Sequence, residues 1–316
     1  VIFTGQGQSP GSWQGINITG KRLDSSAIQI DHALIEYASY GIKFAQGAKG
    51  DITNTGIRHN TYGIYYHGKR TGGTLSHSQL YDNQYGVYVH GGNSNKADHP
   101  SPVVTGNSFY NNTGYHYYSR YFYEAESATL DATGNWWGTT DFAAMAAKIY
   151  DHSDYHQSPM VNYGQMLQAE NGQVVPGSHL LGNISDEVRW QTGDGLVLAE
   201  TRVQAGGHLI IEADSEIKFA AGSGLTVNKN GRLTIIGNSS SPVVLTSAQP
   251  APAVGDWQGI QINAESGDVF ISHAVIEYAD KAISVQGKLA KAQVIQSNIR
   301  DNNYGIYVNG GNADLA

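Results

Sequence analysis

The sequence predicts an all-β solenoid, a parallel β-helix whose coils are about 22 to 23 residues long. The segment 60–66 returns in close copies at 83–89 and 302–308, and each copy carries Asn at its first position and Tyr-Gly at its third and fourth. Glycine is frequent, with 39 of 316 residues, and only 15% of the residues are charged. This composition favours many tight turns over long helices.

The residues around the recurring glycine alternate as those of a β-strand do. The first and third positions after it are apolar or aromatic: Ile42, Ile64, Val87, Ile283 and Ile306, then Phe44, Tyr66, Val89, Val285 and Val308. We expect a second short strand in each coil, at 52–57, 75–80 and 294–299. Each coil buries only a thin apolar strip, so successive coils must stack to form a continuous core.

An asparagine lies three residues before the glycine, at Asn60, Asn83 and Asn302. A turn asparagine tolerates a left-handed backbone, and its amide can bond the same amide one coil away. We therefore expect an asparagine ladder inside the stack. In the coil that contains Gly114, Asn111 fits when counted from the glycine and Asn112 fits when counted from Phe109, and the spacing leaves both open.

Charge and composition exclude several classes of protein. The net charge is −8 with a pI near 5.8, and no Lys/Arg run occurs, which argues against a nucleic-acid or anionic-membrane partner. The absence of cysteine excludes disulfides and cysteine metal sites. The sequence has no apolar run of about 18 residues, so we expect no membrane span. It also has no signal peptide at Val1.

A larger repeat organises the chain into two modules. Residues 1–68 are matched by a second copy that begins at Val243, as the paired segments Trp13–Ile16 and Trp257–Ile260 show. We expect a β-helix module at 1–163 with a capping helix at about 141–151, a connector at 164–182, and a second module at 183–316. Because Val1 matches Val243, we expect the first module to be incomplete at its N-terminus and the second at its C-terminus. The parent protein is then longer, and its neighbouring modules are partners of these two.

These segments carry a family resemblance. Several segments resemble right-handed parallel β-helix repeat modules of large bacterial surface and secreted proteins, in the pectate-lyase-like superfamily. They are the stretch 233–246, the segment Gly255–Ile260, the Ile-Glu-Tyr-Ala and Asn-x-Tyr-Gly-Ile motifs, and Asn135-Trp136-Trp137-Gly138. The resemblance covers nearly all of the chain except 164–182. It implies a right-handed helix and an extracellular or cell-surface location. Its functional content is broad, since such coils serve adhesins, stalks, lyases and hydrolases.

The strongest candidate site is aromatic. We expect an outward stripe of Lys43, Tyr65, Tyr88 and His116 in the first module, with Ser284 and Tyr307 in the second. Flat amphipathic rings suit the apolar faces of sugars, although plain packing between neighbouring strands explains them equally simply. The predicted glycan-binding set is Tyr62, Tyr65, Tyr85, Tyr88, His116 and Tyr118. The loop 90–100 and the run 115–123 would form its walls.

Other polar residues have simpler interpretations. His67 and His90 would stack one coil apart, as a solvated pair more readily than a metal site. The pairs His32/His273 and Glu36/Glu277 recur in both modules, which indicates a structural requirement, and Trp13 and Trp257 fit packing roles. We assign no catalytic residue, no metal site and no cofactor. The one opening for calcium is the oxygen-rich loop that holds Asn93 and Asp98.

The favoured function is therefore a non-catalytic extracellular module, a structural stalk or adhesin segment whose aromatic face binds a polysaccharide or cell-surface glycan. The alternative is a carbohydrate-active enzyme, a polysaccharide lyase or glycoside hydrolase of the β-helix type. Whether the chain is an enzyme stays open at this point, because the acidic residues Asp131, Asp141, Asp151 and Asp154 gather near the expected cap and form no convincing pair.

Overall fold

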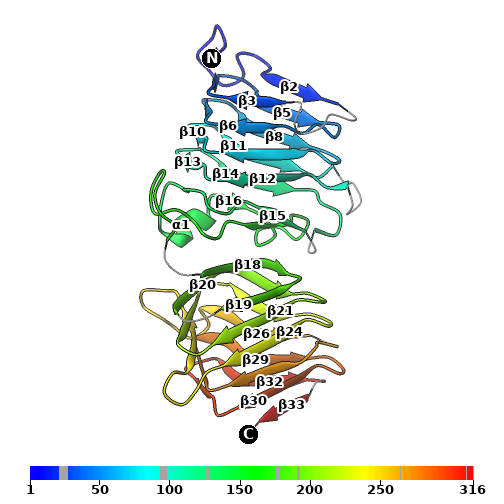
Figure 1. Cartoon of the computed structure of the whole chain (residues 1–316), viewed down its shortest axis with the longest axis vertical. Coiled ribbons are helices and arrows are strands. Elements are labelled where there is room, and N and C mark those ends of the chain that lie inside the picture. Colours follow the sequence, from blue (N-terminus) through cyan, green and yellow to red (C-terminus); the bar gives the residue numbers. More distant parts are fainter. Residues whose placement is uncertain are drawn as a thin grey trace. The chain divides into compact units, whose positions relative to one another are not determined.

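The computed structural model describes residues 1–20, 28–92, 98–125, 128–175, 178–190, 193–263, 265–310 and 312–315. The chain divides into two compact units, 1–175 and 176–316 (Figure 1). Each is described by itself. The loop residue Asn93, which the sequence offered for calcium, lies outside the described residues.

In the described part of the first unit, parallel strands form three sheets, and each full coil contributes one strand to each sheet. Sheet 1 contains β1 (Ile2–Phe3), β4 (Leu34–Glu36), β7 (Gly56–Arg58), β10 (Gln79–Tyr81) and β13 (Ser108–Tyr110). Sheet 2 contains β2 (Ile16–Thr19), β5 (Tyr40–Ala45), β8 (Tyr62–His67), β11 (Tyr85–His90), β14 (Tyr115–Arg120) and β16 (Ile149–Tyr150). Sheet 3 contains β3 (Gln29–Asp31), β6 (Asp51–Thr53), β9 (Gly72–Ser76), β12 (Ser101–Thr105), β15 (Thr129–Asp131) and β17 (Met160–Asn162). The predicted parallel stacking of coils is confirmed.

The core of this unit consists of side-chain columns that run across the coils. Residues at the same register position of neighbouring strands point inward together and are fully buried. Examples are Ile57 on Leu80 in sheet 1 and Ile42, Ile64 and Val87 in sheet 2. The apolar positions around the recurring glycine therefore form the interior, as the alternation indicates.

The expected second strand at 52–57 is wrong in one respect, because it is two strands of different sheets. Between β6 and β7 the chain turns at Asn54, whose φ is +49°. The corresponding residues of neighbouring coils, His32 and His77, have φ values of +50° and +49°. A single left-handed residue thus makes the corner in each coil, a conformation that Asn and His adopt more readily than most residues.

The corner before sheet 2 also has a single left-handed residue, and this residue directly precedes the ladder asparagine. His59, Asp82 and Asp301 have φ near +50° and come directly before the ladder asparagines. The asparagines themselves are therefore not the left-handed residues, and their role is the side-chain ladder described below.

The C-terminal part of the first unit differs from the expected cap. The helix α1 covers only Phe142–Ala146, and Ile149 pairs with Tyr117 in sheet 2 because β16 extends that sheet. Asp141 begins the helix, since its carboxylate accepts a hydrogen bond from the Ala144 N–H at 3.0 Å. No helix of the described chain is long and apolar enough to cross a membrane.

The expected connector at 164–182 belongs to both units. Residues 165–175 form a hairpin in which Leu167 bridges Val174 and Met166 is fully buried. The hairpin reaches back to sheet 1, where Glu170 accepts a hydrogen bond from the Gln79 side chain. The second unit already begins its first strand at Ser178. The apolar anchor Met166 explains why this stretch packs and does not serve as a free linker.

The second unit is also a parallel stack. One sheet contains β18 (Ser178–Ile184), β20 (Gly193–Val203), β22 (Ser215–Phe219), β23 (Gly224–Val227), β25 (Val243–Ser247), β26 (Trp257–Ile262), β28 (Ala274–Glu277), β29 (Ala279–Gln286), β31 (Asn298–Arg300) and β32 (Tyr304–Asn309). The other contains β19 (Glu187–Trp190), β21 (His208–Glu212), β24 (Arg232–Ile236), β27 (Val269–Ser272), β30 (Lys291–Ile295) and β33 (Asn312–Leu315). The long strand β20 pairs with β22 through its first half and with β23 through its second. A continuous buried core lies between the sheets.

Candidate ligand-binding face

Three parallel rows of side chains lie on the outward face of sheet 2, which we call the tyrosine face. The strand register places residues of successive coils directly beside one another. The rows are Tyr40, Tyr62, Tyr85 and Tyr115; then Lys43, Tyr65, Tyr88, Tyr118 and Tyr150; then Ala45, His67, His90 and Arg120. Five of the six predicted site residues, all of them tyrosines, therefore meet on one face.

The tyrosines of each row stack on one another. In the middle row the ring centroids of Tyr88 and Tyr118 are 4.7 Å apart, and those of Tyr118 and Tyr150 are 4.4 Å apart. Rings of the two rows meet edge to face, as Tyr62 and Tyr88 do at 5.2 Å. Tyr88 and Tyr118 are only 8% exposed because neighbouring rings cover their faces. The face therefore offers ring edges and hydroxyls more than flat rings.

Burial also controls the charge state of these phenols. Desolvation, with the neighbouring Tyr40 as the second cause, raises the pKa of Tyr65 to about 12. The pKa of Tyr88 is likewise raised by desolvation, against the opposing effect of Arg120. These hydroxyls are neutral near pH 7, as a phenol of ordinary pKa also is, and can both donate and accept hydrogen bonds.

The expected outward position of His116 is wrong. In the register of β11 and β14, Tyr85 lies beside Tyr115, so His116 takes the place of Gly86 and is only 4% exposed. The turn before β14 contains one extra residue, Gly114, which is not the recurring glycine of the other coils. A count made from Gly114 is therefore wrong by two positions in β14. Tyr118, and not His116, occupies the outward row.

The row of His67, His90 and Arg120 gives the tyrosine face an edge of two imidazoles and one guanidinium, which the sequence interpretation did not bring together. The rings of His67 and His90 are 5.0 Å apart, as their one-coil spacing predicts. Desolvation lowers the pKa of both, with further lowering by Lys43 at His67 and by His67 and Arg120 at His90. Arg120 Nη1 donates to the Tyr118 hydroxyl at 3.2 Å. Strand alternation along β14 places Arg120 on the outward face, two residues after Tyr118. The sequence could have shown this only with the correct register of β14.

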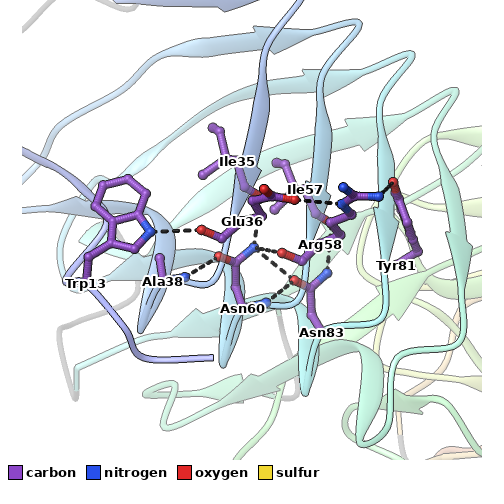
Figure 2. Close-up of polar contacts among 9 residues, drawn as sticks. All are labelled: Trp13, Ile35, Glu36, Ala38, Ile57, Arg58, Asn60, Tyr81 and Asn83. Atoms are coloured by element: carbon purple, nitrogen blue, oxygen red, sulfur yellow. Dashed lines mark hydrogen bonds and ion pairs between the residues drawn. The ribbon is translucent and has the colours of Figure 1, made fainter. Parts of the chain in front are cut away.

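The recurring Glu36 forms a structural ion pair (Figure 2). Arg58 Nε lies 2.8 Å from Glu36 Oε2, and its Nη1 donates to the Tyr81 hydroxyl at 3.4 Å. The second unit repeats this pair, with Arg300 Nη2 2.7 Å from Glu277 Oε2. Trp13 Nε1 donates to the Glu36 carbonyl at 2.8 Å, and Trp257 Nε1 to the Glu277 carbonyl at 2.9 Å. The structural interpretation of these residues is confirmed.

The predicted asparagine ladder is present. Asn83 Oδ1 accepts hydrogen bonds from the backbone N–H and the side-chain amide of Asn60, both at 3.0 Å (Figure 2). Asn112 continues the ladder, since its Oδ1 accepts from the Asn83 N–H at 3.0 Å, and this settles the choice between Asn111 and Asn112. A second ladder, from Asn107 to Asn135, was not predicted. Its asparagines directly follow the left-handed glycines Gly106 and Gly134.

The acidic residues of the expected calcium loop and of the C-terminal part of the first unit form ion pairs and hydrogen bonds within the protein. Asp98, the described part of the expected calcium loop, binds Arg70 Nε at 2.5 Å and Lys69 Nζ at 3.5 Å. Within the described residues, no group of three or more His, Asp or Glu side chains is arranged to hold a metal ion. Asp151 is buried and accepts the backbone N–H groups of Ser153 and Val161 at 2.8 and 3.0 Å.

Comparison with known proteins supports the fold independently. Residues 12–130 match the family model of the right-handed β-helix region, and residues 182–271 match that of the pectate-lyase-like β-helix domain. No curated protein and no solved structure matches the chain. The chain is therefore built of parallel β-helix repeats, a right-handed β-helix region in its first unit and a pectate-lyase-like β-helix domain in its second.

Proposed function

We propose that this chain is a non-catalytic β-helical spacer that binds an extended saccharide along the tyrosine face. The observation that supports this is the alignment of the three outward rows, which repeat at the strand spacing of about 4.8 Å. A ligand that crosses the strands would meet tyrosine hydroxyls and a basic or imidazole group in each of the coils at Tyr65, Tyr88 and Tyr118. The extracellular or cell-surface location is part of the same proposal and follows the resemblance to surface-protein modules.

The covered rings decide how such a ligand would be recognised. Because the faces of Tyr88 and Tyr118 are packed against other rings, the binding contacts are hydrogen bonds to hydroxyls and contacts with ring edges. The neutral phenols can donate to or accept from sugar hydroxyls, and Arg120 donates only. The stacked rings lose little conformational freedom on binding, which lowers the entropic cost of association.

The enzymatic alternative has weaker support. A hydrolase or lyase needs carboxylates whose oxygens are available to substrate or metal. Near the tyrosine face, Asp98 is held by Arg70, and Asp154 Oδ2 accepts the Asp151 N–H at 3.0 Å. These contacts favour a structural use of the acids, so binding is the function that the geometry supports best.

A glycan array followed by calorimetry on the full chain tests the proposal. Tyr65→Phe combined with Tyr88→Phe keeps the stacked rings but removes two hydroxyls, and we expect the affinity for the bound polysaccharide to fall about tenfold or more. Tyr66→Phe is the matched control, because this adjacent tyrosine points into the core and its hydroxyl has no hydrogen-bond partner. Equal binding by the double variant and the wild type would refute binding at the tyrosine face. Cleavage of any bound polysaccharide would favour the enzymatic alternative.

A further inference from the structure

The second unit has a polar cavity of about 280 Å³ on the outward face of its longer sheet. Gly222, Gly224 and Gly259 lie at this cavity, together with Glu200, Gln261 and Lys281 among its polar side chains. The core side chains Ile260 and Ile262 flank Gln261 in sequence and point to the other side of β26. The cavity is therefore an external feature of the sheet and not a packing defect of the core.

The backbone requires a glycine at position 259, at one side of the cavity. Its φ is +95°, and a Cβ there would lie 1.7 Å from the carbonyl oxygen of Lys281 on the next coil. The register between β26 and β29 shifts at this point, between Gly259 and Ile260. A side chain is thus impossible at this position, because the backbone of the next coil occupies the space that a Cβ would need.

Contacts to neighbouring residues hold the polar groups around the cavity in place. Glu200 accepts from Arg202 Nε at 3.1 Å, and Ser284 Oγ accepts from Gln286 Nε2 at 2.8 Å. Lys281 Nζ lies 3.2 Å from Asp280 Oδ2. Groups that are already oriented lose less entropy when a ligand binds.

The first unit provides an internal comparison. Gly15 has the same conformation, with φ of +93°, and its hypothetical Cβ would meet the Tyr40 carbonyl oxygen at 1.4 Å. Tyr40 and Lys43 stand where the second unit has Lys281 and Ser284, and Lys43 Nζ lies 4.9 Å from the centre of the Tyr40 ring. At the register position where the first unit carries Lys43, the second unit carries the small Ser284, which lines the cavity.

The geometry points to a binding site for a single neutral sugar in this cavity. Its volume of about 280 Å³ lies just below the usual range for small-molecule sites, roughly 300–1,000 Å³, which suits a ligand of one ring. Amides, hydroxyls, carboxylates and one ammonium supply donors and acceptors, and a sugar hydroxyl can satisfy both kinds. Arg202 neutralises Glu200 and Lys281 neutralises Asp280, so the charges at the cavity are balanced within the protein and a neutral ligand fits it better than an ion. This site is separate from the tyrosine face and does not depend on it.

Ligand-observed NMR and calorimetry on the full chain test the site with glucose, galactose, mannose and N-acetylglucosamine, and with glucuronate and galacturonate as acidic counterparts. We expect at least one neutral sugar to bind more tightly than either acid. Gln261→Ala removes a polar contact at an exposed position, and Ser284→Tyr fills the cavity with the residue that the next coil already carries at Tyr307. Each variant should lower the affinity at least tenfold, whereas Tyr65→Phe with Tyr88→Phe should leave it unchanged.

Three results would overturn this assignment: no binding of any neutral sugar, binding of an acid that equals or exceeds that of the neutral sugars, or wild-type affinity in Ser284→Tyr. If Ser284→Tyr folds poorly, Gln261→Ala still tests the site. If the double variant Tyr65→Phe with Tyr88→Phe loses polysaccharide binding but keeps its affinity for the single sugar, the two sites are independent.

Discussion

The side-chain amide of Asn112 donates a hydrogen bond to Nδ1 of His116 at 2.9 Å, at the end of the asparagine ladder. In the preceding coils this donor meets the Oδ1 of the next asparagine, as Asn83 meets Asn112 at 3.2 Å. His116 therefore substitutes for an asparagine as the acceptor. A neutral imidazole is required, because a protonated Nδ1 could not accept the hydrogen bond.

Acid should weaken the first unit through His116. Desolvation, with Lys148 as the second cause, lowers the pKa of His116 to about 4 from its ordinary 6.5. The neutral form is favoured in the folded state, so its contribution to stability is complete above pH 6.5 and is lost as the pH falls towards 4, by about 3 kcal/mol. His116→Gln should flatten this part of the curve in urea unfolding measured from pH 7 to pH 4. An unchanged slope would mean that His116 is already exposed to solvent.

Asp151 should have the opposite effect in an overlapping range. Burial is the main cause that raises its pKa from 3.8 to about 6, against the lowering effect of its backbone hydrogen bonds. The protonated form is favoured in the folded state, so this contribution is complete below pH 3.8 and is lost as the pH rises through 6, by about 3 kcal/mol.

The Asp151 term can be isolated by substitution. Asp151→Asn should unfold more easily than wild type below pH 4, because one of two accepted N–H bonds is lost. Its stability should no longer fall between pH 4 and 6. The same urea series on wild type and Asp151→Asn measures this difference. A fall of equal size in both proteins would assign the pH dependence to another group.

The recurring glycine has a steric cause that a matched pair of variants can measure. A Cβ at Gly63 would lie 2.5 Å from the carbonyl oxygen of Gly86 on the next coil, whereas at Gly305 the nearest atom is a methyl carbon of Ile299 at 3.5 Å. Gly63→Ala should lower the free energy of unfolding by about 1–3 kcal/mol through this overlap. Gly305→Ala should be neutral or slightly stabilising, as the natural Ala282 at the same place in the preceding coil indicates. Equal effects in chemical denaturation would contradict the steric explanation.

The repeat made most of the fold predictable, because one register rule applies to every coil. The positions of Asn60, Ile64 and Tyr65 follow directly from the spacing and from strand alternation. The rule failed where a residue was inserted: Gly114 lengthens one turn, and so His116 was predicted to face outward. Corners at single left-handed residues such as Asn54 were missed, because one residue is too short a signal to end a strand.

Features that depend on tertiary contacts were not predictable from spacing. The ring of Tyr88 is enclosed because Tyr65 and Tyr118 of its own row lie against it and Tyr85 of the adjacent row meets it edge to face. The hairpin at 165–175 has no repeat to compare with, and its anchor Met166 is a single apolar residue in a polar stretch. The register shift between β26 and β29 beside Gly259, at one side of the cavity, is not revealed by any local sequence pattern.

The most direct measurement is the affinity of the full chain for a length series of the polysaccharide that binds it. The middle row from Lys43 to Tyr150 crosses four coil steps, roughly 19 Å at the strand spacing of about 4.8 Å. An extended ligand on the tyrosine face should therefore bind more tightly with each added sugar until it spans these coils, and no further beyond that length. A single sugar unit that competes as well as the longest chain, with the cavity of the second unit closed by Ser284→Tyr, would contradict binding along the tyrosine face.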